Sequence, residues 1–272
     1  MENLDGFQTF AWVVLNSIAR ARNAIYLDTN AWSLLAKGEV PAEPLEKWAK
    51  ANGCFLWVAR MQVAELAARR EIVEMLASLL ERVGVLLLDR DQNEFTGLPW
   101  HQVPIPLQQF LRLSTQELKE EFIQQFTVTM EPARQQLERD RATFKTWLDQ
   151  ALATIPPDDR RDWSTFSRRL ESWIRYKCMS NGRELNEAAL HNPECYVGLR
   201  LSYAVLFVRY VLNRQTWQDG DYLDYLHAAD MAYARVVVTE RNMAECIRQA
   251  IRRPELTGPE LVVDTSWLRE PH

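Results

Sequence analysis

The chain has 272 residues, of which 47% are hydrophobic and 25% charged, and its formal net charge is −5. This composition indicates a globular protein with a sizeable core, and it excludes a disordered chain and a protein that coats nucleic acid over its whole surface. The four cysteines form no C-x-x-C pair, so we interpret them as reduced core thiols rather than a disulfide framework or a zinc site.

The N-terminal segment favours a soluble protein. Its apolar stretch, residues 10–18, has no basic segment before it and is too short to span a bilayer. No other segment reaches eighteen apolar residues without a charge. We therefore expect a cytoplasmic protein that does not enter a membrane.

Helical patterns and short apolar runs then alternate along the chain. The helical patterns cover residues 8–21, 32–38, 44–52 and 60–82. The apolar runs predict buried strands over residues 24–28, 54–58, 85–88, 236–238 and 261–263. This alternation predicts an α/β fold, with a mostly parallel central sheet of about five strands flanked by helices.

Residues 91–214 carry scarcely any strand signal and predict a large all-helical insertion. After a proline-containing loop, the predicted helices cover residues 115–152, 162–179 and 194–212. We therefore expect one α/β domain made of residues 1–90 and 215–272, interrupted by the insertion.

Acidic residues stand where elements of this sheet end or begin. Asp28, Thr29 and Asn30 follow the first strand, and Glu65 lies early in the helix after the second. Because the carboxyl ends of parallel strands meet at one edge, these side chains are expected to share that edge. Alternatively, Glu65 pairs with Arg60 or Arg69 on a helix surface.

A third acidic segment precedes the fourth strand. Asp219 is the expected N-cap of a helix in which Asp221, Asp224 and His227 recur every three residues and share one side. Asp230 continues the spacing but has rotated away from Asp221. Alternatively, Asp221 stabilises the helix dipole and His227 is a hydrogen-bonded core histidine.

The fourth strand ends in Thr239 and Glu240, which repeat the hydroxyl and acid of the first strand's end. Either residue could instead cap the next helix. Asp89 and Asp264 end other strands, and we interpret both as turn or cap residues held in reserve as site residues.

Converging carboxylates repel one another, so they bind a hard cation or acquire raised pKa values. Oxygen-only ligands favour Mg²⁺ or Mn²⁺. Such a cation lowers the pKa of bound water and neutralises the leaving oxygen of a phosphodiester, so hydrolysis of a nucleic acid is the expected chemistry.

These motifs resemble the PIN-domain nucleases, a family that includes ribonuclease toxins of bacterial toxin–antitoxin pairs. Residues 27–30, followed by Trp32 and Ser33, are similar to the family's first acidic motif, and Glu65 to its second. Asp221 or Asp224 corresponds to the third. Thr239 and Glu240 are similar to the last, where the family commonly has Asp or Asn rather than Glu.

The resemblance covers roughly residues 20–90 and 215–265 and implies a parallel-sheet nuclease core that holds Mg²⁺ or Mn²⁺. The implied catalytic residues are Asp28, Glu65, Asp221, Asp224 and Glu240. Asp28, Glu65 and Asp224 are the implied metal ligands, and Thr29, Asn30, His227 and Thr239 would orient ligands or water. The helical insertion has no counterpart in the small toxins.

Residues 160–183 carry seven basic residues against two acidic ones. The expected RNA contacts are Arg160, Arg161, Arg168, Arg169, Arg175 and Lys177. Interleaved aromatic residues could stack unpaired bases, which suits single-stranded RNA. Alternatively, the segment is a solvated helix face, and for Trp163, Phe166 and Trp173 we favour a place in the core.

The leading hypothesis is a metal-dependent endoribonuclease acting on RNA, with DNA not excluded as a substrate and with a homo-oligomer or an inhibitory protein partner left open. A phosphatase using Asp28 as nucleophile is disfavoured, because such enzymes want a second acid where Asn30 stands. A third hypothesis is a catalytically inactive PIN-like scaffold that binds RNA or a protein partner, motivated by Glu240 and the insertion.

Overall fold

The computed structural model describes residues 23–59, 62, 65, 66, 69, 71, 72, 74, 75, 85–88, 97–99, 131–218 and 220–269. Several predictions lie outside these residues: the first helix, most of the helix over 60–82, Asp89 and the first part of the helix over 115–152. Everything that follows concerns the described residues.

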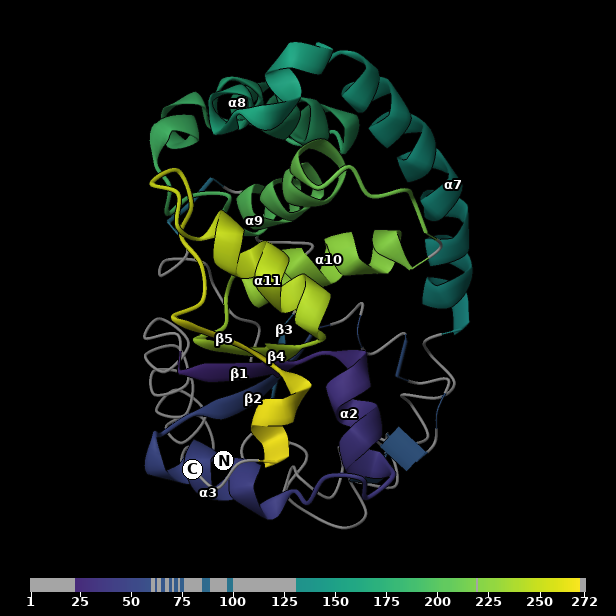
Figure 1. Ribbon diagram of the computed structural model, residues 1–272, viewed down its shortest axis with the longest axis vertical. Helices are drawn as coiled ribbons and strands as arrows, with labels where there is room; N and C mark the ends of the chain where they lie inside the picture. Colours follow the sequence, from purple (N-terminus) through teal and green to yellow (C-terminus); the bar gives the residue numbers. More distant parts are fainter. Residues whose placement is uncertain are drawn as a thin grey trace, which may run out of the picture.

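The predicted α/β architecture is confirmed, with an all-parallel sheet flanked by helices (Figure 1). Its strands are β1 (Ala24–Leu27), β2 (Phe55–Ala59), β3 (Val85–Leu88), β4 (Val236–Thr239) and β5 (Leu261–Asp264). They lie in the order β3-β2-β1-β4-β5. The order reverses between β1 and β4, and a crevice at the carboxyl ends of such a pair is where open α/β sheets bind ligands.

The strands are apolar without interruption because both faces of the sheet are covered. On one face, Ile25 and Leu27 of β1 pack with α2 (Thr29–Ala36), α3 (Glu43–Ala51) and η5 (Thr265–Arg269). On the other face, Tyr26 packs with α9 (Val197–Leu206), α10 (Asp221–Met231) and α11 (Arg241–Ala250). Figure 1 shows these two sets of helices on opposite sides of the sheet.

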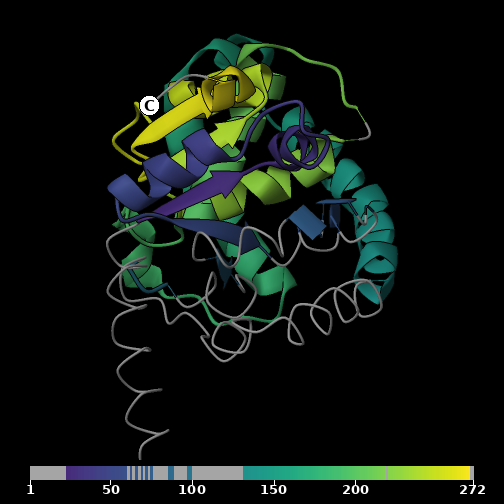
Figure 2. The same ribbon diagram turned by 90° about the horizontal axis from the view of Figure 1, so that it is seen from below.

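The remaining helical elements extend the helical layer that α9, α10 and α11 form on the second face of the sheet. They are α7 (Glu131–Ala153), η2 (Pro157–Arg161), α8 (Trp163–Ser180), η3 (Glu187–His191) and η4 (Phe207–Leu212). Figures 1 and 2 show α7 along one side of the molecule, where it reaches α10. The predicted helix over 194–212 changes type along its length. It is α-helical in α9 and continues as a π-helix in η4.

One hydrophobic cluster joins these helices to the sheet. Phe144 of α7, Phe166 of α8 and Phe207 of η4 belong to the same buried cluster as Tyr26 of β1. The cluster therefore crosses the predicted boundary between the 1–90/215–272 domain and the 91–214 insertion, and that division stays a prediction.

Two expectations about side chains in this core are confirmed. The four cysteines are buried and none forms a disulfide, as reduced core thiols should be. Phe166 is fully buried, and Trp163 and Trp173 pack against the same cluster, so these three aromatic residues of α8 are core residues. The fourth aromatic residue of α8, Tyr176, is 53% exposed.

Candidate functional site

Asp28 joins the ends of β1 and β4. It is the N-cap of α2, and its Oδ1 accepts a hydrogen bond from the Ala31 amide at 2.8 Å. Its Oδ2 accepts from the Thr239 hydroxyl at 2.6 Å and from the Glu240 amide at 2.9 Å. The first and last predicted motifs therefore meet through one carboxylate.

Burial raises the pKa of the Asp28 carboxyl above its ordinary value. Hydrogen bonds from Thr239, Ala31 and Glu240 and the charge of His227 oppose this effect and do not cancel it. The carboxylate is thus buried with incomplete compensation of its charge, which is the condition under which a carboxyl group binds a proton or a cation.

Glu65 lies at the same edge, in a chain of hydrogen bonds. Its Oε2 accepts from the Thr29 hydroxyl at 2.5 Å and lies 2.9 Å from Nε2 of His227. Nδ1 of His227 is 2.6 Å from the Tyr26 hydroxyl, which is buried in β1. The alternative pairing with Arg69 is not the main contact of Glu65. Arg69 donates a hydrogen bond to Ser33 and affects the pKa of Glu65 through its charge, after His227 and Thr29. Arg60 lies outside the described residues.

The Glu65–His227 contact is an ion pair. Burial lowers the pKa of His227, but the hydrogen bond and the charge of Glu65 outweigh burial and raise it to about 9. Burial in turn raises the pKa of Glu65, but the hydrogen bond and charge of His227 and the Thr29 hydroxyl bring it below its ordinary value. His227 is therefore hydrogen-bonded, as the alternative interpretation expected, and its partner is a predicted site residue.

Arg209, which sequence reasoning missed, binds the acids of α10. Its Nη1 donates to Oδ1 of Asp221 at 2.8 Å and to Oδ2 of Asp224 at 2.7 Å, and its Nη2 lies 3.8 Å from Oε1 of Glu240. The side chain is 3% exposed. The signal was its place in the apolar run 207–211, because a buried arginine requires an acidic partner.

The start of α10 differs from the prediction in one detail. The N-cap is Gly220 rather than the predicted Asp219, because the helix begins at Asp221. Oδ2 of Asp221 accepts a hydrogen bond from the Gln218 amide at 2.6 Å, which ties the preceding turn to the helix. Asp221 therefore has a local structural role as well as its contact with Arg209.

Glu240 connects the two groups of acids. It is the N-cap of α11, yet its side chain makes no capping hydrogen bond. Burial first, and then the charge of Asp224, raise the pKa of Glu240; Arg209 opposes them, and Asp28 and Asp221 add further. Its half-exposed carboxylate thus interacts electrostatically both with Asp28 and with the acids that Arg209 binds.

The other predicted residues lie around this edge. Asn30 is exposed in the first turn of α2, and Asp230 is buried in α10, where its charge helps to raise the pKa of His227. Asp264 accepts a hydrogen bond from the Ser266 amide at 2.9 Å, as a cap residue does. Asp264 thus acts as the predicted cap, and its backbone pairs with Thr239 at the end of β4.

The donors at this edge suit a hard divalent cation in their chemistry, since they are carboxylates and hydroxyls in a region of excess negative charge. Their arrangement fits less well. The described residues include no group of three His, Cys, Asp or Glu side chains placed to hold a metal ion. Asp221 and Asp224 instead share the Arg209 guanidinium.

Most of the predicted RNA-binding arginines have partners within the helical layer. Arg168 donates to Thr165, Arg169 to the Thr154 carbonyl at 2.8 Å, and Arg175 to Glu187. Lys177 lies in the last turn of α8. Arg160 and Arg161 are in η2, and their side chains lie outside the description.

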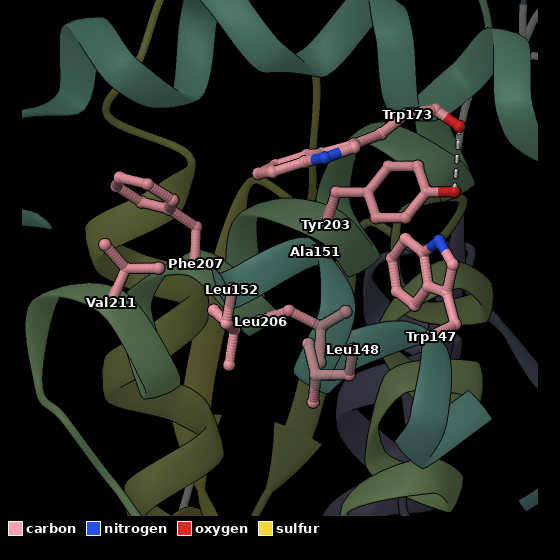
Figure 3. A pocket seen from close by; sticks show the side chains of 9 residues that line it. All are labelled: Trp147, Leu148, Ala151, Leu152, Trp173, Tyr203, Leu206, Phe207 and Val211. Atoms are coloured by element: carbon pink, nitrogen blue, oxygen red, sulfur yellow. Dashed lines mark hydrogen bonds between the residues drawn. The ribbon is translucent and has the colours of Figure 1, made fainter. Parts of the chain in front are cut away.

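A pocket between α7, α8, α9 and η4 shares no residue with the acidic edge (Figure 3). Trp147, Trp173, Tyr203 and Phe207 dominate its lining, and the Tyr203 hydroxyl donates to the Trp173 carbonyl at 3.2 Å. The lining contains no Asp, Glu, His, Lys, Arg or Cys side chain, so the acidic edge is the stronger candidate for chemistry.

Comparison with known proteins gives no family, since no family model, no curated protein and no solved structure matches this chain. Within the described residues, no helix has the length and apolar character needed to cross a membrane. The geometry at the carboxyl edge of the sheet is therefore the basis for assigning a function.

Proposed function

We propose that the protein is a metal-dependent endoribonuclease whose site lies at the carboxyl ends of β1 and β4. The observation that carries this proposal is the Asp28 carboxylate, which receives hydrogen bonds from Thr239 and Glu240 at the point where the strand order reverses. An acid held there is positioned to meet a ligand in the crevice.

Charge supports the same proposal. Among the described residues, the carboxylates of Asp28, Glu65, Asp221, Asp224 and Glu240 outnumber the cations Arg209, His227 and Arg69 at this edge. Burial and then the charge of Asp224 raise the pKa of Glu240, whereas burial alone raises that of Asp28, so an excess of negative charge is felt at Glu240 and an incompletely compensated burial at Asp28. A divalent cation would relieve both.

Asp28, Glu65 and Asp224 are the proposed ligands. Mg²⁺ or Mn²⁺ held there would supply an activated water and would neutralise the leaving oxygen of a phosphodiester. Thr29 and His227 fix the Glu65 carboxylate, and Thr239 fixes that of Asp28. Exposed Asn30 would face water and an RNA strand at the same edge.

The test is cleavage of labelled single-stranded RNA and DNA with Mn²⁺, Mg²⁺ or EDTA. Asp28→Asn should abolish metal-dependent cleavage, because the neutral amide lacks the negative charge with which the carboxylate would hold the cation. Asp149→Asn is the matched control, since Asp149 is an exposed acid of α7 paired with Lys145 and should leave cleavage unchanged. Equal cleavage by wild type and Asp28→Asn would contradict the proposal.

A second function is favoured by the absence of a three-ligand group among the described residues and by the engagement of Asp221 and Asp224 with Arg209. It is a catalytically inactive scaffold that binds RNA or a protein partner. Retention of RNA binding in EDTA, without Mn²⁺ binding or cleavage, would favour the scaffold over the nuclease.

A further inference from the structure

The Arg209 guanidinium stands among three of the carboxylates that were predicted to form the catalytic set. One of its terminal nitrogens, Nη1, donates to both Asp221 and Asp224, and the other lies 3.8 Å from Glu240. Carboxylate oxygens converge in this way on a bound cation. In this protein the cation is the guanidinium of Arg209.

The local backbone holds Arg209 in this position. It lies in η4, whose π-helical turns follow α9 directly. Short π-helical segments are rare and occur mainly at functional sites. The Arg209 side chain is itself only 3% exposed, so its guanidinium is held within the protein rather than in solvent.

We propose that Arg209 is a built-in cation that keeps Asp221 and Asp224 from binding a divalent metal and restricts metal binding to the Asp28–Glu65 side of the edge. This inference rests on the proposed function, whose third ligand, Asp224, it reassigns to a positioning role. A divalent ion beside the guanidinium would be repelled by it and would compete for the same oxygens.

The role of Arg209 explains why the donor atoms at this edge suit a divalent cation although the described residues form no three-ligand group. Arg209 neutralises the two carboxylates that it contacts through Nη1, whereas the Asp28 carboxylate accepts hydrogen bonds from the Thr239 hydroxyl and from the amides of Ala31 and Glu240, which carry no formal charge. Among the described residues, the carboxylate that lacks a contacting cation is thus on the Asp28 side of the edge.

The test uses the full chain and counts bound Mn²⁺ by electron paramagnetic resonance, with Mn²⁺ alone as the probe. Arg209→Met removes the guanidinium and leaves Asp221 and Asp224 facing each other without a cation. We expect this variant to bind one more equivalent of Mn²⁺ than the wild type does. Arg209→Lys keeps a positive charge and should bind the same number as the wild type.

Arg200→Met is the matched control. Arg200 is also 3% exposed, but it donates to the carbonyls of Cys195, Leu190 and Glu255 rather than to carboxylates. Its removal should destabilise the protein and should not add an Mn²⁺ site. An additional equivalent in Arg200→Met as well would overturn the inference.

Arg209→Met could fail to fold, because two acids are left without their partner. The inference then predicts that Mn²⁺ restores folding, measured by far-ultraviolet circular dichroism in Mn²⁺ and in EDTA. A variant that is unfolded in both, or folded with no additional Mn²⁺, would overturn it.

The same experiment separates this inference from the proposed function. If wild type binds no Mn²⁺ but Arg209→Met does, Arg209 is the built-in cation and the nuclease proposal fails. If wild type binds Mn²⁺ and Arg209→Met binds no more, the nuclease proposal stands and the role of Arg209 is overturned.

Discussion

At the scale of single residues, the site depends on small polar groups that orient larger ones. Thr239 is 1% exposed, and its hydroxyl donates to the Asp28 carboxylate across the β1–β4 boundary. Sequence could place Asp28 and Thr239 at one edge because both end apolar strands. It could not reveal the π-helix that carries Arg209, since the run around this residue has no periodicity that separates a π-helix from an α-helix.

Thr239→Val should remove this hydrogen bond while keeping the shape of the side chain. The Asp28 oxygen would then lose one of its donors, and we expect a loss of roughly 1–2 kcal/mol in the free energy of unfolding. Urea denaturation measures it. Thr239→Ser is the matched control and should restore most of the stability; an equal loss in both variants would show that the methyl group, not the hydroxyl, matters.

At the scale of elements, the strands were predictable because each is a short, continuous apolar run between polar residues. The order of the strands was not, because it depends on contacts between segments far apart in sequence, such as Ile25 of β1 with Val236 of β4. A second contact between distant segments lies near Gly97, where Pro99 forms an antiparallel bridge with Cys195.

Gly97→Ala should destabilise this contact between the segment and α9. The backbone of Gly97 has φ +64, and an added Cβ would lie 2.7 Å from both the Asn186 Cβ and the Tyr196 hydroxyl. Gly53→Ala is the matched control, because Gly53 has φ +61 and open space around it. In both variants the left-handed conformation should lower the free energy of unfolding by about 1 kcal/mol. Only Gly97→Ala should lose a further amount on the order of 1–3 kcal/mol from the clash, and thermal denaturation measures both losses. Equal losses would contradict the packing argument.

At the scale of the whole molecule, the helical layer and the sheet share one core. The sequence predicts a helical insertion because residues 91–214 carry scarcely any strand signal, but composition cannot tell whether helices form their own core or cover a neighbouring sheet. Phe207 contacts Trp163 and Phe166 within the cluster that includes Tyr26 of β1, so the described helices and the sheet pack continuously, and the division into domains stays a prediction.

A shared core predicts a single cooperative unfolding transition. Phe207→Ala should lower its midpoint, with a loss of roughly 3–5 kcal/mol, while keeping one transition. Far-ultraviolet circular dichroism and tryptophan fluorescence should give coincident urea curves for wild type and variant. Two separated transitions would instead support independent domains.

The contact between Asp28 and Thr239 also has a consequence for synthesis on the ribosome. The two residues are separated by 211 positions, so the carboxylate emerges early and its partner emerges last among the strands that flank it. At about 5–20 residues per second, the interval is roughly 10–40 s. During that time β1 has no β4 beside it, and a growing chain cannot hold the assembled site. The protein thus acquires its acidic edge only after Thr239 has been made, which delays any activity of that edge until synthesis has passed β4.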